Sequence, residues 1–290
     1  MPIENLKRRI KVTEDLREIV GTMKALSSVS ILQYEQANTA LESYRNTLKD
    51  AFHALVRQGG APQNIQPSGN NRQLVILIGS DNGMVGKFNK EIIDMAKTDL
   101  RRQGVATKDV LFLTIGKRIG SIAAQNNFRL YAKYAVANSV KMVNTIAETV
   151  IMKIDEAVRK EHVGIVSVWY HKRRKNMPIN VQKQQIIPFD LSAYKKLKDK
   201  PWGTNNIPLI PVERKKMFTA LLNEYLTIAL ASQLNYSLAA EHYTRMTNMQ
   251  NAEKNIDKSL EEMNLSYQQE RQENITDELI DVISGAEAVK

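Results

Sequence analysis

Apolar side chains recur at steps of three and four residues along the first part of the chain. This stripe consists of Ile3, Leu6, Ile10, Thr13, Leu16, Val20, Met23 and Leu26. The spacing places these side chains on one seam of a helix, as in a coiled coil. Gly21 is the single glycine between residues 3 and 58, so we expect one uninterrupted helix that stops at Gly59 and Gly60.

The last part of the chain has a longer stripe with the same spacing. It consists of Phe218, Leu221, Tyr225, Ile228, Ser232, Tyr236, Ala239, Tyr243, Met246, Met249, Ala252, Ile256, Leu260, Met263 and Tyr267. Pro211 lies near its start and Gly285 near its end, as is typical of helix boundaries. Neither helix can leave an apolar seam in water, so we expect an antiparallel pair. Two ordinary amphipathic helices of a bundle are the alternative.

The middle of the chain alternates between strand and helix patterns. Strands are predicted at Gln73–Gly79, Val110–Ile115, Val163–Tyr170 and Ile179–Phe189, and helices at Phe88–Gln103, Lys117–Asn126 and Ser139–Arg159. The segment Tyr131–Ala135, after the second of these helices, is not assigned to either type. Strands separated by helices favour a small, largely parallel sheet. The predicted fold class is therefore α/β with long helices: an antiparallel two-helix coiled coil formed by both termini, and a central Rossmann-like α/β domain.

Breaks in composition divide the chain into four segments. They are an N-terminal helix (1–57), a polar linker rich in proline and glycine (58–71), the α/β domain (72–200) and a C-terminal helix (201–290). The net charge of +10 is uneven: segment 72–200 has 24 Lys and Arg against 11 Asp and Glu, which is +13. This basic segment could face phosphates, anionic lipid headgroups or an acidic protein, or could be an ordinary solvated face.

Several classes of chemistry are excluded or disfavoured by composition. The chain has no cysteine, which excludes disulfides, a thiolate nucleophile and cysteine-ligated metals, and its four histidines are too scattered for a metal site. No nucleophile arrangement can be assembled, so we expect no catalytic residue, cofactor or metal. The charged N-terminus resembles no signal peptide, and the uncharged stretch Tyr225–Ala240 is too short to span a bilayer, so we expect a soluble, intracellular protein.

Two loops are candidates for binding. Gly79–Lys87 joins a strand to a helix, a context that suits phosphate, but its spacing fits neither a P-loop nor a dinucleotide fingerprint. We expect a tight structural connection in which Asp81 caps or pairs locally. The basic run His171–Lys175 follows Trp169 and Tyr170 and could contact nucleic acid, but a solvated loop after a strand is the favoured interpretation.

Both ends of the chain resemble the gamma subunit of F-type ATP synthases, and the resemblance covers nearly the full length. The C-terminal match is the most specific and consists of Glu241, Arg245, Met246, Thr247, Met249, Leu265, Tyr267, Arg271, Gln272, Ile275, Thr276, Glu278, Leu279, Val282, Ile283, Ser284, Gly285 and Ala286. The N-terminal match consists of Arg9, Ile10, Ile19 and Met23. The family's Ser-Asp-Arg-Gly-Leu-Cys-Gly-Gly-Leu-Asn segment corresponds to Ser80–Asn89.

The chain departs from the family pattern at several of these positions. Asn82, Val85 and Lys87 replace an arginine, a cysteine and a glycine of the segment just named. The stretch from Asp15 to Glu35 looks more like the alternate F-type ATPases that are proposed to pump sodium. These departures concern the coupling ion and the direction of work rather than the role of the subunit.

The resemblance implies a rotor. The helix pair would be a shaft inside a sleeve of alpha and beta subunits, and the α/β domain would be a foot that rests, with the epsilon subunit, on the membrane ring of c subunits. The residues implied in contacts with the sleeve are Met23, Lys24, Glu241, Arg245, Arg271, Gln272, Thr276 and Glu278, and those implied in the foot loop are Asp81, Gly83, Gly86 and Asn89. The subunit would be non-catalytic and peripheral, at the cytoplasmic face of the cell membrane, with no nucleic-acid partner.

Two other function classes stay open from the residues alone. A coiled-coil protein could bind nucleic acid through its basic middle, and salt-dependent binding of DNA or RNA by the isolated chain would favour it. A nucleotide-using α/β enzyme with helical arms is the second alternative, which saturable binding of ATP by the isolated chain would support.

Overall fold

A computed structural model describes residues 3–59, 72–173, 177–189, 201–202, 206 and 208–287, with side chains up to residue 284. The chain divides into two compact units. Unit 1 comprises residues 1–28 and 245–290, and unit 2 comprises residues 29–244. The two long helices, α1 (Ile3–Arg57) and α6 (Arg214–Glu287), each contribute to both units. At 1.5 Å per residue they are about 80 and 110 Å long.

Unit 2 is built on a five-stranded sheet of order β3-β2-β1-β4-β5. Its strands are β1 (Arg72–Ile78), β2 (Leu111–Ile115), β3 (Arg129–Tyr134), β4 (Val163–Lys172) and β5 (Asn180–Ile187). β1 to β4 are parallel, and β5 runs antiparallel to β4. The prediction of a largely parallel sheet is confirmed, and the ends of the four predicted strands lie within about two residues of the observed ones, which is the usual uncertainty of such boundaries. The remaining strand, β3, overlaps the segment Tyr131–Ala135, which the sequence pattern does not assign as a strand.

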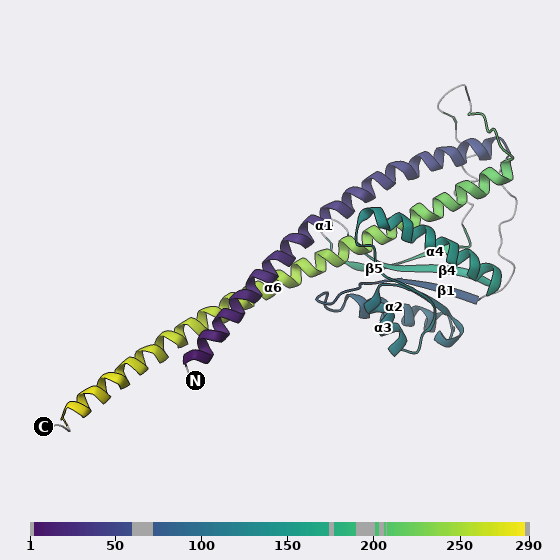
Figure 1. The fold of residues 1–290 in the computed structure, drawn as a ribbon. Helices are drawn as coiled ribbons and strands as arrows, with labels where there is room; N and C mark the ends of the chain where they lie inside the picture. Colours follow the sequence, from purple (N-terminus) through teal and green to yellow (C-terminus); the bar gives the residue numbers. More distant parts are fainter. Residues whose placement is uncertain are drawn as a thin grey trace. The chain divides into compact units, whose positions relative to one another are not determined.

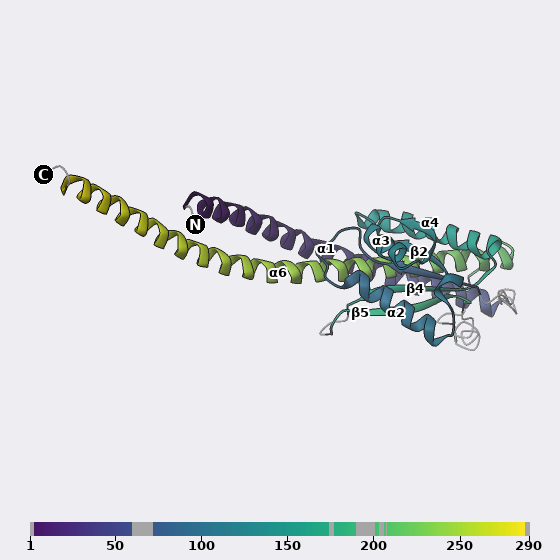
Figure 2. The same cartoon turned by 90° about the horizontal axis from the view of Figure 1, so that it is seen from below.

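Helices cover both faces of the sheet. The helices α2 (Phe88–Arg102) and α3 (Lys117–Gln125) lie on one face, and α4 (Val140–Lys160) lies on the other together with the part of α6 that belongs to unit 2 (Figures 1 and 2). A short 3-10 helix, η1 (Thr107–Asp109), precedes β2.

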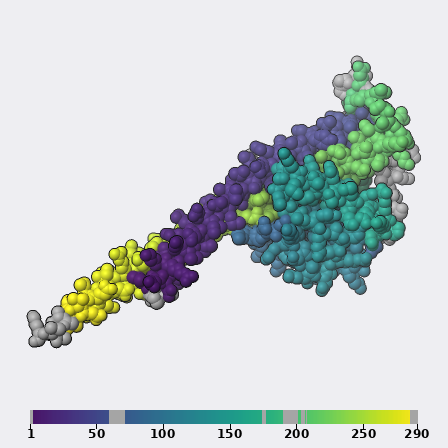
Figure 3. Space-filling model, in the orientation of Figure 1, coloured from purple at the N-terminus to yellow at the C-terminus, as the bar shows by residue number. Residues whose placement is uncertain are grey.

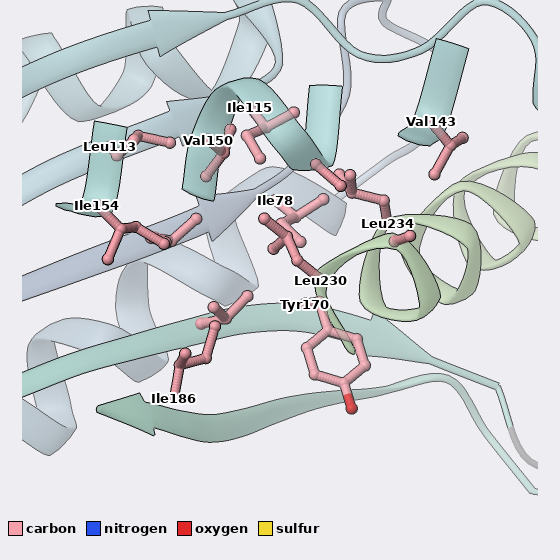
Figure 4. Close-up of a cluster of buried hydrophobic side chains, with 14 of the residues drawn as sticks. Ile78, Leu113, Ile115, Val143, Val150, Ile154, Tyr170, Ile186, Leu230 and Leu234 are labelled. Carbon is pink, nitrogen blue, oxygen red and sulfur yellow. The ribbon is translucent and has the colours of Figure 1, made fainter. Parts of the chain in front are cut away.

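Alternation along the strands supplies both cores. On β1, Val75 and Leu77 pack toward α2 and α3, whereas the neighbouring side chains of the strand, Ile76 and Ile78, pack toward α4 and α6. Figure 4 shows side chains of the second cluster from strands, α4 and α6: Ile78, Leu113, Ile115, Val143, Val150, Ile154, Tyr170, Ile186, Leu230 and Leu234. The same cluster also contains Tyr34 of α1. Helix α6 is therefore part of the core of the α/β fold and not merely attached to it.

The two long helices run antiparallel in each unit. In unit 2 the Tyr44 hydroxyl donates to Glu224 Oε1 at 3.1 Å, and the Phe52 ring meets Phe218 edge-on at 5.9 Å between centroids. In unit 1, Arg17 Nε lies 2.7 Å from Asp257 Oδ1. Because later residues of α1 meet earlier residues of α6 at both places, the predicted antiparallel pair is confirmed.

The seam of α1 differs from the predicted stripe. Leu16 and Leu26 are 47% and 64% exposed, although both were expected to be buried in the seam. Ser27 is 2% exposed and Lys24 pairs with Glu253, so polar and small residues take the seam positions instead. A heptad spacing that starts at Ile10 and Thr13 reaches Arg17, Lys24 and Ser27. Each of these residues directly follows one of the apolar residues of the predicted stripe: Leu16, Met23 and Leu26.

The seam of α6 in unit 1 agrees with the prediction. Met249 and Leu260 are buried, and Ala252, Ile256, Met263 and Tyr267 are half-buried. Beyond Glu270 every described side chain up to Ser284 is exposed. The end of α6 extends past the first turn of α1 in this unit, as the yellow and purple atoms of Figure 3 show.

Candidate functional site

The loop between β1 and α2 uses its polar groups to hold the α/β fold together. Asp81 Oδ1 accepts hydrogen bonds from the backbone N–H of Lys117, at 2.7 Å, and of Val136, at 3.2 Å. The first of these N–H groups opens α3, where a carboxylate also complements the helix dipole. Asp81 thus caps a helix, but its partners lie 36 and 55 residues away rather than within the loop, so the expectation of local capping or pairing is wrong.

Asn89 closes the same loop from the start of α2. Its Oδ1 accepts from the Ser80 backbone N–H at 2.9 Å and its Nδ2 donates to Ser80 Oγ at 2.8 Å, and the Asn89 side chain is buried. Gly79 leaves the space for this contact, because a Cβ there would lie 2.4 Å from Asn89 Oδ1. Both polar atoms of the Asn89 amide are therefore engaged within the protein.

The two predicted loop glycines have different surroundings. Gly86 has a φ of +57°, a conformation that glycine adopts without strain. Gly83 has no atom within 4 Å of an added Cβ and no positive φ. The loop thus depends on Gly79 and Gly86 for its path, and its predicted residues Asp81, Gly83, Gly86 and Asn89 lie together at the carboxyl ends of the parallel strands.

The crevice beside β1 and β4 is filled by side chains. Open α/β sheets bind ligands at the carboxyl ends of their strands, where the strand order reverses. Here Val85, Phe88 and Ala240 form a buried cluster, and the His171 ring stacks on Phe88 at 3.8 Å between centroids. The side chains that fill this place leave little room for a nucleotide.

His171 is a core residue. Its side chain is fully buried, and burial lowers the pKa of His171 to about 3, so the imidazole is neutral at neutral pH. Its Nε2 lies 3.5 Å from Glu91 Oε2, a contact that is not an ion pair while the ring is neutral. The prediction of a solvated loop from residue 171 onward is wrong for this residue.

The two cations that follow pack on aromatic rings. Lys172 Nζ lies 4.0 Å from the Tyr236 ring centroid, and the Arg173 guanidinium carbon lies 4.1 Å from that of Tyr243. Arg173 Nη1 is also 3.3 Å from Glu35 Oε1. The end of β4 is thereby tied to α1 and α6 within unit 2. Arg174 and Lys175 lie outside the described residues.

Of the predicted sleeve contacts, Met23, Lys24 and Arg245 belong to unit 1, and Glu241 belongs to unit 2. Met23 is half-buried, and Lys24 forms an ion pair with Glu253 across the two helices. Glu241 and Arg245, predicted to contact a surrounding sleeve, are 4% and 7% exposed. Such burial leaves these two side chains little surface for another chain.

The last four predicted residues are at the surface. Arg271, Gln272, Thr276 and Glu278 are exposed on α6, and the Thr276 hydroxyl donates to the Gln272 carbonyl at 2.9 Å within the helix. Large apolar side chains are exposed in the same segment: Ile275, Leu279, Ile280, Val282 and Ile283. Four of them, Ile275, Leu279, Val282 and Ile283, are named above only as part of the family match and not as an apolar surface. Their helical spacing, four residues from 275 to 279 and from 279 to 283, indicates such a surface.

Neither a metal centre nor a membrane span is found in the described part of the chain. Among these residues, no group of three carboxylate or imidazole side chains lies close enough to hold a metal ion. None of the described helices is long and apolar enough to cross a membrane.

Comparisons with known proteins agree with this geometry. The model of the family described as ATP synthase matches residues 2–289. The ATP synthase gamma chain of Clostridium kluyveri is 26% identical over 98% of this chain and 97% of the relative, and that of Geobacter metallireducens is 24% identical over 99% of both. The matches do not test the sodium-pumping branch, which stays a prediction.

Solved structures share the fold. A chain from the rotor of the Euglena gracilis mitochondrial ATP synthase has a TM-score of 0.61 and 16% identity, and covers 94% of this chain and 98% of its own length. A chain from the central stalk and c ring of the Tetrahymena thermophila enzyme has a TM-score of 0.53 and 18% identity, with 81% and 99% covered. Neither a nucleic-acid-binding protein nor a nucleotide-using enzyme finds support among these matches.

Proposed function

The chain belongs to the ATP synthase family, as a gamma chain, and from that premise we propose that it turns as the central shaft of a rotary ATP synthase and carries no catalytic site of its own. Its segments then have separate tasks: 1–57 and 201–290 supply the shaft helices, 58–71 is a linker, and 72–200 supplies most of the foot, whose core also includes residues 230–239 of α6. Catalysis takes place on the alpha and beta subunits around the shaft.

The observation that carries the proposal is the exposed end of α6. All described side chains from Arg271 to Ser284 are exposed, and several are large and apolar. Apolar side chains that stay exposed in a contiguous segment indicate a surface that another protein covers. A sleeve of subunits around this end would cover them.

Within that segment, we assign the contacts with the sleeve to Arg271, Gln272, Thr276 and Glu278. Their side chains are exposed, and a group on a rotating surface can meet the sleeve in some orientations and not in others. Met23 is a weaker candidate because it is half-buried, and Lys24 acts within the shaft through Glu253. Burial assigns Glu241 and Arg245 to the interior of the chain rather than to the sleeve.

The foot supplies the other contacts. Its charge of +13 would suit acidic loops of the c ring, and the epsilon subunit would bind beside it. In this arrangement the complex lies at the cytoplasmic face of the cell membrane and the subunit is peripheral. Asp81 and Asn89 would preserve the shape of the foot, since their polar atoms are engaged inside it.

A single cysteine tests the assignment, because the chain has none of its own. We expect Gln272→Cys with a short photoactivated cross-linker to give a product with the alpha or beta subunit in the assembled complex, and to block ATP-driven rotation. Arg102→Cys, at an exposed position of α2 in the foot, is the matched control and should give no alpha or beta product. A product with the sleeve from position 102 and none from position 272 would refute the proposal.

A further inference from the structure

Strand β3 forms one edge of the sheet, with β2 on its inner side. Among the described residues, no strand pairs with its outer side. The Tyr134 carbonyl accepts from the Gly116 N–H at 2.8 Å, so the backbone groups of Tyr134 face β2. Since these directions alternate along a strand, the N–H and C=O groups of Lys133 face outward. Such an edge can accept a strand from another chain.

A groove of about 600 Å³ lies beside this edge, between α3 and β3. The residues that α3 contributes to the middle of the groove are small: Gly120, Ser121 and Ala124. Lys133 also lines it, and its Cδ lies 4.0 Å from the Cβ position of Gly120. The small residues leave room for alternate side chains of an added strand.

The charged side chains that line the groove are both basic, and the nearby Asp81 carboxylate is engaged by the backbone N–H groups of Lys117 and Val136. Residues 110–147 contain five basic residues and no Asp or Glu, and Lys117 and Lys133 both line the groove. Neither lysine forms an ion pair with any other described residue. A second copy of this edge would be repelled by like charge, whereas an acidic segment would be attracted. The positive charge of the groove therefore favours an acidic segment over a second copy of this edge.

We propose that the outer edge of β3 and the groove beside α3 bind an extended, acidic segment of another protein chain. The segment adds a strand to the sheet through the outward backbone groups of β3, and its carboxylates lie near Lys117 and Lys133. This surface is independent of the proposed rotation of the shaft, so either idea can fail without the other.

The test uses the full-length chain and a six-residue peptide of alternating glutamate and valine, matched to the six residues of β3. We expect binding that weakens as salt is added, and slower hydrogen exchange at residues 129–135 when the peptide is present. The same peptide with every backbone amide methylated cannot pair as a strand through either edge and should not bind. This control leaves the protein unchanged.

Variants separate the two parts of the site. Lys117→Glu with Lys133→Glu should weaken binding by roughly a hundredfold, at about tenfold for each reversed charge. Ser121→Trp should block the groove without a change in charge. Lys254→Glu with Lys258→Glu makes the same change in net charge in unit 1 and should have no effect on the affinity. Circular dichroism should show that each variant is folded.

Several results would overturn the proposal. They are the absence of binding at about 1 mM peptide, equal affinity for the methylated peptide, equal affinity in the Lys117 and Lys133 variant, and protection of β5 in place of β3. Vesicles of phosphatidylglycerol that protect residues 129–135 as strongly as the peptide does would overturn it in favour of a lipid surface.

Discussion

Helix α6 meets two very different environments along its length. From Ile228 to Glu241 none of its side chains is exposed, and from Arg271 to Ser284 all of them are. The first stretch contains no charged residue before Glu241, whereas the second contains five. The backbone conformation is the same in both. The difference in charged residues between the two stretches therefore reflects their burial and not a requirement of helix formation.

The middle of α6 stabilises the fold, whereas its exposed end is available for contacts with other subunits. In unit 2, Leu230, Leu234 and Leu238 pack in the same cluster as the sheet and α4, so the small and uncharged residues around them are needed for close packing. At the end of α6, removal of a side chain leaves no cavity in the described structure. We expect substitutions in the middle of α6 to impair folding of the chain, and substitutions at its end to impair rotation in the assembled complex.

The largest expected effect comes from the same substitution made in both places. Leu234→Ala removes a fully buried side chain and should lower the free energy of unfolding by about 2–5 kcal/mol. Leu279→Ala, at a side chain that is 58% exposed, should change it by less than about 0.5 kcal/mol. Urea unfolding of the free chain measures both. Equal losses would show that the end of α6 is packed in solution.

An intermediate effect should appear on lowering the pH, and it should arise in unit 2. Burial lowers the pKa of His171 from its ordinary value of 6.5 to about 3. As the pH falls below 6.5 the unfolded chain binds a proton that the folded chain does not, so stability is lost from pH 6.5 down to about 3. The loss should be about 2 kcal/mol by pH 5.

The substitution His171→Phe isolates this contribution. It keeps a ring against Phe88 and removes the titrating group, so the variant should lose about 2 kcal/mol less than the parent chain between pH 7.5 and pH 5. Carboxylates that also titrate in this range cancel in the difference. An identical pH dependence of unfolding in the two proteins would contradict the assigned pKa.

The smallest effect should be seen in unit 1, with salt rather than pH as the variable. Lys24 and Glu253 form an ion pair whose side chains are 34% and 28% exposed. A double-mutant cycle with Lys24→Ala and Glu253→Ala should give a coupling of about 0.2–1 kcal/mol, because such pairs are partly screened by solvent. The coupling should shrink as salt is raised to about 1 M. A coupling that salt leaves unchanged would indicate a dry seam.

The fold was largely predictable because its signals are local. Runs such as Gln73–Gly79 and the face through Val143, Val150 and Ile154 identify a buried strand and an amphipathic helix without knowledge of their partners. The parallel direction of most strands followed from the alternation of strands and helices. What the pattern could not supply was the order of the strands in space.

The seam of α1 was harder to predict because hydrophobicity and geometry disagree there. Leu16, Met23 and Leu26 are the apolar choices, but a heptad that continues from Ile10 and Thr13 reaches Arg17, Lys24 and Ser27. Arg17 and Lys24 pair there with Asp257 and Glu253, which lie far away in the sequence.

The candidate sites show the same limit. The partners of Asp81 are Lys117 and Val136, which lie in other parts of the chain, and only its tendency to cap a helix could be predicted. The burial of His171 and the packing of Lys172 and Arg173 could not, because Phe88, Tyr236 and Tyr243 approach them from other elements. The sequence of a basic segment does not show whether its side chains are solvated or packed, because that depends on residues elsewhere in the chain.

The charged seam of unit 1 has a consequence for alignment of the two helices. An apolar seam tolerates sliding by one heptad, since one aliphatic contact then replaces another. Sliding α6 by seven residues would place Lys24 opposite Leu260 or Met246 in place of Glu253, and Arg17 opposite Asn264 or Gln250 in place of Asp257. Each shift would lose both ion pairs at once and set an ammonium group against an apolar side chain. The two ion pairs can therefore form together in only one of these three alignments of the helices.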